Sequence, residues 1–241
     1  MSGLFGPNNN KRSRFVIFTF ISAIYVYLIT FRFELSLADI IGVTLLFSLL
    51  STVIVNRPNI SFKNAPLSVV LPFSSILGTI LFLQSFINFT LPFKLFIIFG
   101  FMVIYYPIVL SLNIFLVVSE EGSIIPLYRV ASTWNQILLS LVSIPLFAGI
   151  LKFNLYSIYI SVAIFIITVV FNIYNIWAIR LDPEARRTRV GDILLLSGLS
   201  GFLVYCVVIG LSFFPSESFL IALTASSMLM FTLTYTGGYL R

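Results

Sequence analysis

The chain has 241 residues, of which 59% are hydrophobic and only 9% are charged, and its mean hydropathy is +1.10. A soluble core of this length cannot absorb so much apolar surface, so the composition excludes an ordinary soluble globular protein and indicates an integral membrane protein. There is no histidine and one cysteine, Cys206, which excludes imidazole-ligated haem, His-containing zinc sites, Ser-His or Cys-His nucleophiles and an intramolecular disulfide. We therefore expect no metal and no other cofactor.

Eight apolar runs each approach the roughly 20 residues that cross a hydrocarbon core of about 30 Å. They do not alternate apolar and polar residues with a period of two, as the strands of a membrane barrel would. The sequence predicts an all-α, polytopic membrane protein with transmembrane helices at about 15–31, 36–55, 67–87, 94–118, 130–151, 155–179, 193–214 and 219–240. Three prolines fall inside these runs, and we expect Pro72, Pro107 and Pro145 to bend or interrupt their helices.

The connections between the runs are too short to hold a soluble domain or a nucleotide-binding fold, so a single transmembrane domain is expected over 1–241. Residues 1–14 form a polar cytoplasmic tail. The apolar run that follows could pass for a signal peptide, but it lacks a small-residue cleavage site, and we interpret it as an uncleaved first helix. The remainder divides into a two-helix N-terminal extension at 15–55 and a six-helix core at 67–240.

The basic residues are distributed unequally when the eight runs are threaded alternately through a membrane. One side holds eleven of the fourteen: Lys11, Arg12, Arg14, Arg57, Lys63, Arg129, Arg180, Arg186, Arg187, Arg189 and Arg241. The other side holds Arg32, Lys94 and Lys152. The positive-inside rule therefore predicts a multi-pass protein of the cell membrane with both termini in the cytoplasm. No basic run is interleaved with aromatic residues in a polar domain, so we expect contact with membrane lipid and no binding of nucleic acid.

Two predicted cytoplasmic connections carry most of the acidic residues. The first contains Glu120, Glu121, Gly122, Ser123, Pro126, Leu127 and Arg129. The second contains Asp182, Glu184, Arg186, Arg187 and Arg189. In the second, Asp182, Pro183 and Glu184 supply an N-cap acceptor, a first-position proline and a first-turn acid, which predicts a short amphiphilic surface helix. The first is also compatible with a plain helix end, in which the two glutamates are solvated and Gly122 makes the C-terminal turn.

The first connection resembles the coupling segment of ABC-type exporter permeases of the drug and polysaccharide export class. Residues 120–124 match the acid-acid-Gly-Thr/Ser-Leu element that closes the second core span in that family. Residues 137–139 match the Ile-Leu-Leu run with which the next span begins. The chain departs from the family in three ways: the family's next acid is Ile125 here, residues 131–133 replace its Pro-Val-Ser step, and two spans precede the region that corresponds to its core.

The resemblance implies the transmembrane permease subunit of an ATP-driven exporter, with no catalytic activity of its own. Such a subunit forms homo- or heterodimers and converts the closing of two partner ATPase subunits into movement of helices around a pathway. The resemblance also implies a short cytoplasmic helix that inserts into the ATPase. In it, Glu121 would pair with a basic residue of the partner, Gly122 would allow the sharp turn, Pro126 would fix the backbone before the helix and Arg129 would anchor its far end.

Two other functions remain open. A non-catalytic structural or assembly subunit of a membrane complex also suits phenylalanine-rich spans with few polar groups. A membrane prenyltransferase-like enzyme is the less favoured alternative, because residues 171–192 distantly resemble the acid-rich loop of those enzymes. Asn172, Asn175 and Arg180 stand where paired carboxylates would be needed to hold magnesium.

Amides within the predicted spans could line a pathway or could form hydrogen bonds between helices. They are Gln84, Asn113, Asn135, Gln136, Asn172 and Asn175. The only acid within a predicted span, Asp39, lies close to its start and is interpreted as an interfacial residue.

Overall fold

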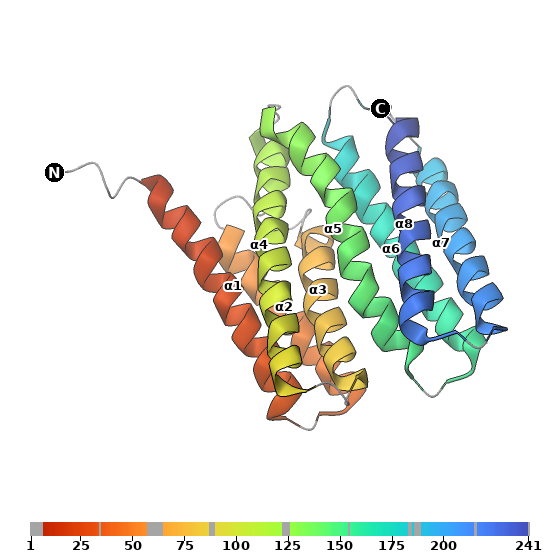
Figure 1. Ribbon diagram of the computed structural model, residues 1–241. Helices are drawn as coiled ribbons and strands as arrows, with labels where there is room; N and C mark the ends of the chain where they lie inside the picture. The colour runs from red at the N-terminus through yellow and green to blue at the C-terminus, as the bar shows by residue number, and fades with distance from the viewer. Residues whose placement is uncertain are drawn as a thin grey trace.

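A computed structural model describes residues 7–33, 35–56, 65–86, 90–121, 126–153, 155–182, 185, 189–214 and 216–240. Within these ranges the chain forms eight α-helices and no strand (Figure 1). They are α1 Pro7–Phe31, α2 Leu37–Asn56, α3 Ala65–Ser85, α4 Leu91–Glu121, α5 Pro126–Leu151, α6 Ser157–Arg180, α7 Val190–Ser212 and α8 Ser218–Leu240. Each is long and apolar enough to cross a membrane, which confirms the predicted all-α class of multi-pass membrane protein.

Several helices extend beyond the predicted spans into polar sequence. α1 begins at Pro7, and α5 begins at Pro126, whereas residues 15 and 130 were the predicted starts. Proline suits the first position of a helix, because the amide hydrogen that it lacks would have no helical acceptor there. In consequence, the residues from Pro126 onward that were expected to form a separate coupling helix form the first turn of α5 instead.

No helix is interrupted at an internal proline. α3 continues through Pro72, α4 through Pro107 and α5 through Pro145. Of the two expected effects, an interruption is therefore wrong at all three positions, and a bend stays a prediction. Within a bundle, neighbouring helices and local adjustments compensate for the one hydrogen bond that each proline removes.

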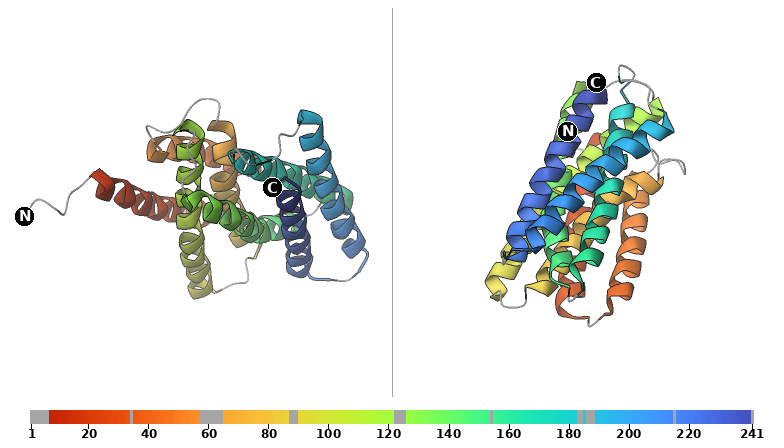
Figure 2. Two further views of the ribbon diagram at one scale, coloured as in Figure 1. Left: turned by 90° about the horizontal axis from the view of Figure 1, so that it is seen from above. Right: turned by 90° about the vertical axis from the view of Figure 1, so that its right-hand side faces the viewer.

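Successive helices run in opposite directions, and their contacts form two rings of four helices that are joined by an extensive contact between α3 and α5 (Figure 1). In the first unit α1 packs against α2 and α4, and α3 packs against α2 and α4. The second unit repeats this ring, with α5 on α6 and α8, and α7 on α6 and α8. Figure 2 (left) shows α1–α4 on one side and α6–α8 on the other, with α5 between them. Each unit is an up-down-up-down four-helix bundle.

The predicted division was a two-helix N-terminal extension before a six-helix core. In the structure α1 packs against α2, α3 and α4, and α2 packs against α1 and α3. The predicted division after residue 55 stays a prediction.

The two bundles meet along a close contact between α3 and α5, which run in the same direction. A Cβ atom added to Gly78 would lie 2.9 Å from the Leu146 Cβ, and one added to Gly149 would lie 2.7 Å from the Leu81 Cβ. Two glycines, one on each helix, thus let the backbones approach, as small residues do between membrane helices. The other large seam, between α6 and α7, also depends on a glycine, since a Cβ on Gly201 would meet Val169 at 2.8 Å.

Candidate functional site

The first predicted connection lies at the tip of a helical hairpin formed by α4 and α5 (Figure 1). Glu120 and Glu121 are the last residues of α4 and Pro126 is the first residue of α5, whereas Gly122 and Ser123 lie outside the described residues. In the first turn of α5, Leu127 and Arg129 are exposed.

The hairpin is long enough to project from a membrane. α4 has 31 residues and is the longest of the described helices. At about 1.5 Å per residue it is about 46 Å long, against a hydrocarbon core of about 30 Å. Trp134, two turns into α5, is 52% exposed, and exposed tryptophans favour the membrane interface. The residues between Trp134 and the tip are therefore expected at headgroup level or beyond it.

A buried cluster holds the hairpin tip against the end of α6. We call it the tip cluster, and it consists of Phe115, Val118, Tyr128, Ala131 and Ala178. The Tyr128 hydroxyl donates hydrogen bonds to the carbonyl oxygens of Ala178 and, at 3.2 Å, of Ile179. The rings of Phe115 and Tyr128 pack edge to face, with their centroids 6.0 Å apart.

Sequence reasoning missed Tyr128, although it stands inside the motif that was singled out. From the sequence alone, a tyrosine between Leu127 and Arg129 is predicted to lie at the membrane interface as an anchor. Its burial, at 1% exposed, follows from the position of α6, which no local pattern reveals. As a result, the two predicted connections, at the ends of α4 and α6, are joined by packing and by hydrogen bonds.

Most of the surface helix expected in the second connection falls outside the described residues. The backbone N–H of Ala185 donates to the carbonyl oxygen of Asp182 at 3.0 Å, and Ala185 lies in a bend. The expected helix therefore stays a prediction. Glu184, Arg186 and Arg187 lie outside the described residues.

Arg189 is exposed and immediately precedes α7. Its backbone N–H donates to the Asp192 carboxylate at 3.1 Å. Asp192 thus caps the start of α7. The role predicted for Asp182, at the start of a separate surface helix, stays a prediction.

Both connections lie at the end of the molecule where α1 begins and α8 ends (Figure 1). We call this the basic end, because the chain order assigns to it eleven of the fourteen basic residues and five of the eight acidic ones. The opposite end has three of each. The net charge of +6 is therefore located entirely at the basic end.

Buried amides and hydroxyls gather inside the α5–α8 bundle. Asn172 donates from its amide nitrogen to the hydroxyl of Ser200 and, at 3.5 Å, to that of Thr236, which joins α6 to α7 and α8. The amide nitrogen of Asn175 donates to the Leu233 carbonyl oxygen at 3.4 Å. These contacts support the interhelical interpretation for both asparagines.

Much of the hydrogen-bonding capacity of this bundle is unused. Asn135 is fully buried, and neither its amide nitrogen nor its amide oxygen has a partner. Other buried oxygens without a partner belong to Thr168, Asn172, Tyr174, Asn175, Ser197 and Ser226. We call this set, with Asn135, the polar interior. An unpaired buried polar atom costs about 1–3 kcal/mol, so each of these groups would be stabilised by a water molecule or by another polar partner.

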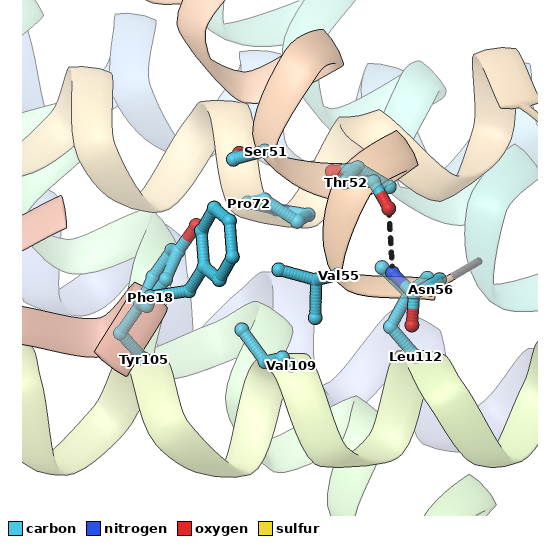
Figure 3. Close-up of a pocket in the computed structure, with 9 residues that line it drawn as sticks. All are labelled: Phe18, Ser51, Thr52, Val55, Asn56, Pro72, Tyr105, Val109 and Leu112. Carbon is cyan, nitrogen blue, oxygen red and sulfur yellow. Dashed lines mark hydrogen bonds between the residues drawn. The ribbon is translucent and has the colours of Figure 1, made fainter. Parts of the chain in front are cut away.

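The α1–α4 bundle has a corresponding but better paired polar region. Asn113 donates to the Asn56 amide oxygen at 3.3 Å, and Asn56 donates to the Thr52 carbonyl oxygen at 2.9 Å. Asn56 and Thr52 line one side of a cavity of about 10 Å³, with Tyr105 beside Phe18 on the other (Figure 3). A space of this size holds about one water molecule.

Asp39, the only acid expected within a span, is exposed in the first turn of α2. Its carboxylate accepts a hydrogen bond from the Ser36 hydroxyl at 2.6 Å, and its backbone N–H donates to the same hydroxyl at 3.3 Å. This arrangement at a helix start agrees with the interfacial interpretation and leaves the polar interior without a carboxylate among the described residues.

Comparison with known proteins does not assign the chain to a family, because no protein-family model, no curated protein and no solved structure matches it.

Proposed function

We propose that this chain is the transmembrane permease subunit of an ATP-driven exporter, which couples a separate ATPase to the movement of a substrate. The observation that carries the proposal is the α4–α5 hairpin. It ends in an acidic pair at the basic end, and the tip cluster fixes it to α6. A partner that pushes on the hairpin therefore acts on the two bundles together.

The mechanical path from the tip to the membrane is short. α5 is one continuous helix from Pro126 to Leu151, so a displacement at its first turn tilts the whole helix along the α3–α5 contact. The Tyr128 hydroxyl passes the same displacement to the last turn of α6. Asn172 and Asn175 lie one to two turns farther along α6, and their bonds to α7 and α8 rearrange when α6 tilts.

The residues of the first connection have defined roles in this proposal. Glu121 pairs with a basic residue of the ATPase, and Arg129 holds the first turn of α5 to headgroups or to an acid. The polar interior offers hydrogen-bonding groups to the transported substrate, and a second permease chain completes the pathway. These groups favour an uncharged polar substrate, because the polar interior contains no charged side chain.

The test replaces Glu121 by arginine. If Glu121 contacts the ATPase, Glu121→Arg puts like charges at a partly desolvated interface, which costs several kcal/mol of binding. The variant is expected to reach the membrane at normal levels, to lose its ATPase during purification and to stop stimulating ATP hydrolysis. Glu217→Arg makes the same change of charge at an exposed position at the opposite end and should have none of these effects. Absence of any ATPase among the partners of the unmutated protein would end the proposal.

A specific observation favours a second candidate, a non-catalytic assembly subunit. The first half of α1 leans away from the bundle (Figure 1), and Ile17, Phe20 and Ile24 are 53%, 54% and 57% exposed. A membrane helix of another protein could pack on this face. An assembly subunit would keep its partners in the Glu121→Arg variant and lose them when Phe20 is replaced by a small residue.

A further inference from the structure

A groove opens at the basic end where the two bundles meet. It has a volume of about 300 Å³ and lies between α3, α6 and α7. Its wall is apolar, with Leu67 of α3, Ile176 and Trp177 of α6 and Ile193 of α7. Among the described residues that line it, Arg180 is the single charged one. We call it the inter-bundle groove.

Arg180 is available to a ligand. It is the last residue of α6, it is exposed, and its side chain has no hydrogen bond or ion pair with any residue that the structure describes. The two acids nearest to it along the described chain are engaged elsewhere. Asp192 accepts the hydrogen bond that begins α7, and Asp182 has another partner. Arg180 therefore lines the groove with an unpaired positive charge, at the end that carries the whole net charge of +6.

The depth of the groove matches the boundary between headgroups and hydrocarbon. Arg180 ends the membrane-crossing stretch of α6, and Trp177 lies one turn inside it. Arginine and tryptophan side chains both favour this level, because their apolar parts can lie in hydrocarbon while their polar ends reach the headgroups. Ile173 and Ile193, which are partly buried, continue the groove with hydrocarbon surface. One end of the groove thus suits a phosphate and the other suits an acyl chain.

We propose that the inter-bundle groove binds one anionic phospholipid, with its phosphate on Arg180 and an acyl chain along Ile173 and Ile193. Arginine recognises phosphate by paired N–H donors. A zwitterionic lipid offers the same phosphate but carries a compensating cation, so the positive field of the basic end favours an anionic headgroup. The bound lipid would join the two bundles at the end where α3 and α6 meet. This proposal does not depend on the exporter proposal.

The test uses the purified, delipidated full chain in detergent and native mass spectrometry. The probes are phosphatidylglycerol and phosphatidylcholine with identical acyl chains, and inorganic phosphate alone. We expect one phosphatidylglycerol to be retained about fivefold more strongly than phosphatidylcholine, in line with one well-placed basic residue. Arg180→Gln should abolish this preference. Arg12→Gln removes an exposed arginine at the same end that does not line the groove, and it should leave the preference unchanged.

A second variant tests the groove itself. Ile193→Trp fills the apolar part and should weaken the retention of both lipids while the chain still elutes as the unmutated protein does. Equal retention of the two lipids by the unmutated chain would overturn the proposal, and so would an Arg12→Gln effect as large as that of Arg180→Gln, which would indicate general charge attraction. Displacement of the lipid by inorganic phosphate would show a free-anion site and would equally overturn it.

Discussion

The buried asparagines show what one residue contributes to this bundle and how far its role can be predicted. An amide within an apolar run is visible in the sequence, and its need for a partner follows from elementary physics. Its partner is not visible, because it depends on the rotation of the helix and on which helix lies opposite. Asn172 meets Ser200 and Thr236, whereas Asn135 meets no polar atom that the structure describes.

This difference predicts opposite effects for the same substitution at two positions. Asn172→Leu removes the donor that joins three helices and should destabilise the protein by about 1 kcal/mol, as interhelical hydrogen bonds in membranes do. Asn135→Leu removes two unpaired polar atoms and should be neutral or stabilising. The measurement is the midpoint of thermal unfolding in detergent for each variant.

Equal destabilisation by both substitutions would show that Asn135 has a partner, such as water, in the folded protein. If Asn135→Leu instead raises stability and transport activity falls, the amide acts on the substrate. The two results separate a packing role from a functional role at the same residue.

At the scale of the element, the sequence predicts where helices are but not where they touch. The apolar runs mark all eight helices, and the main errors are at the ends, where proline at the first position extends α1 and α5. Which helices become neighbours could not be predicted, because helices that are apolar on all sides present no stripe that points to a partner. The contact of Gly78 with Leu146 is the clearest case, because no sequence pattern near either residue predicts that they pack together.

The α3–α5 contact predicts a strong dependence on a single glycine. Gly149→Val would place a Cβ 2.7 Å from the Leu81 Cβ and 3.0 Å from the Leu81 carbonyl carbon, so the two backbones must separate. Overpacking of this kind costs about 1–3 kcal/mol. Gly210→Val introduces the same side chain in a helix with no atom within 4 Å of the new Cβ, and it serves as the control.

Thermal unfolding in detergent should therefore show a lower midpoint for Gly149→Val than for Gly210→Val. Equal midpoints would mean that α3 and α5 are not in close contact in the folded protein. The comparison tests the junction of the bundles without reference to any function.

For the whole molecule, composition was sufficient to predict a helical membrane protein, and the distribution of basic residues predicts its orientation. No sequence pattern predicted the arrangement into two four-helix bundles, because it depends on how the helices pack against one another. The candidate site was predicted in part. The motif at Glu120 and Glu121 located the hairpin tip, but the burial of Tyr128 and the groove at Arg180 depend on contacts between distant segments.

The orientation can be tested by labelling single cysteines in intact cells. In a Cys206→Ser background, a cysteine in place of Leu127 at the basic end should be protected from a membrane-impermeant thiol reagent. A cysteine in place of Glu217 at the opposite end should react. Both residues are exposed, so access to the reagent depends on the side of the membrane. The reverse pattern would place the hairpin tip outside the cell and would remove the basis for an ATPase partner.

The concentration of charge at the basic end also bears on insertion into an energised membrane. Turning the inserted protein over would carry a net six positive charges from one side of the bilayer to the other. Each elementary charge that crosses 100 mV changes the free energy by about 2.3 kcal/mol, so the field alone distinguishes the two orientations by about 14 kcal/mol. A chain that enters such a membrane with its basic end on the negative side is therefore held there electrically, before any partner or lipid is bound.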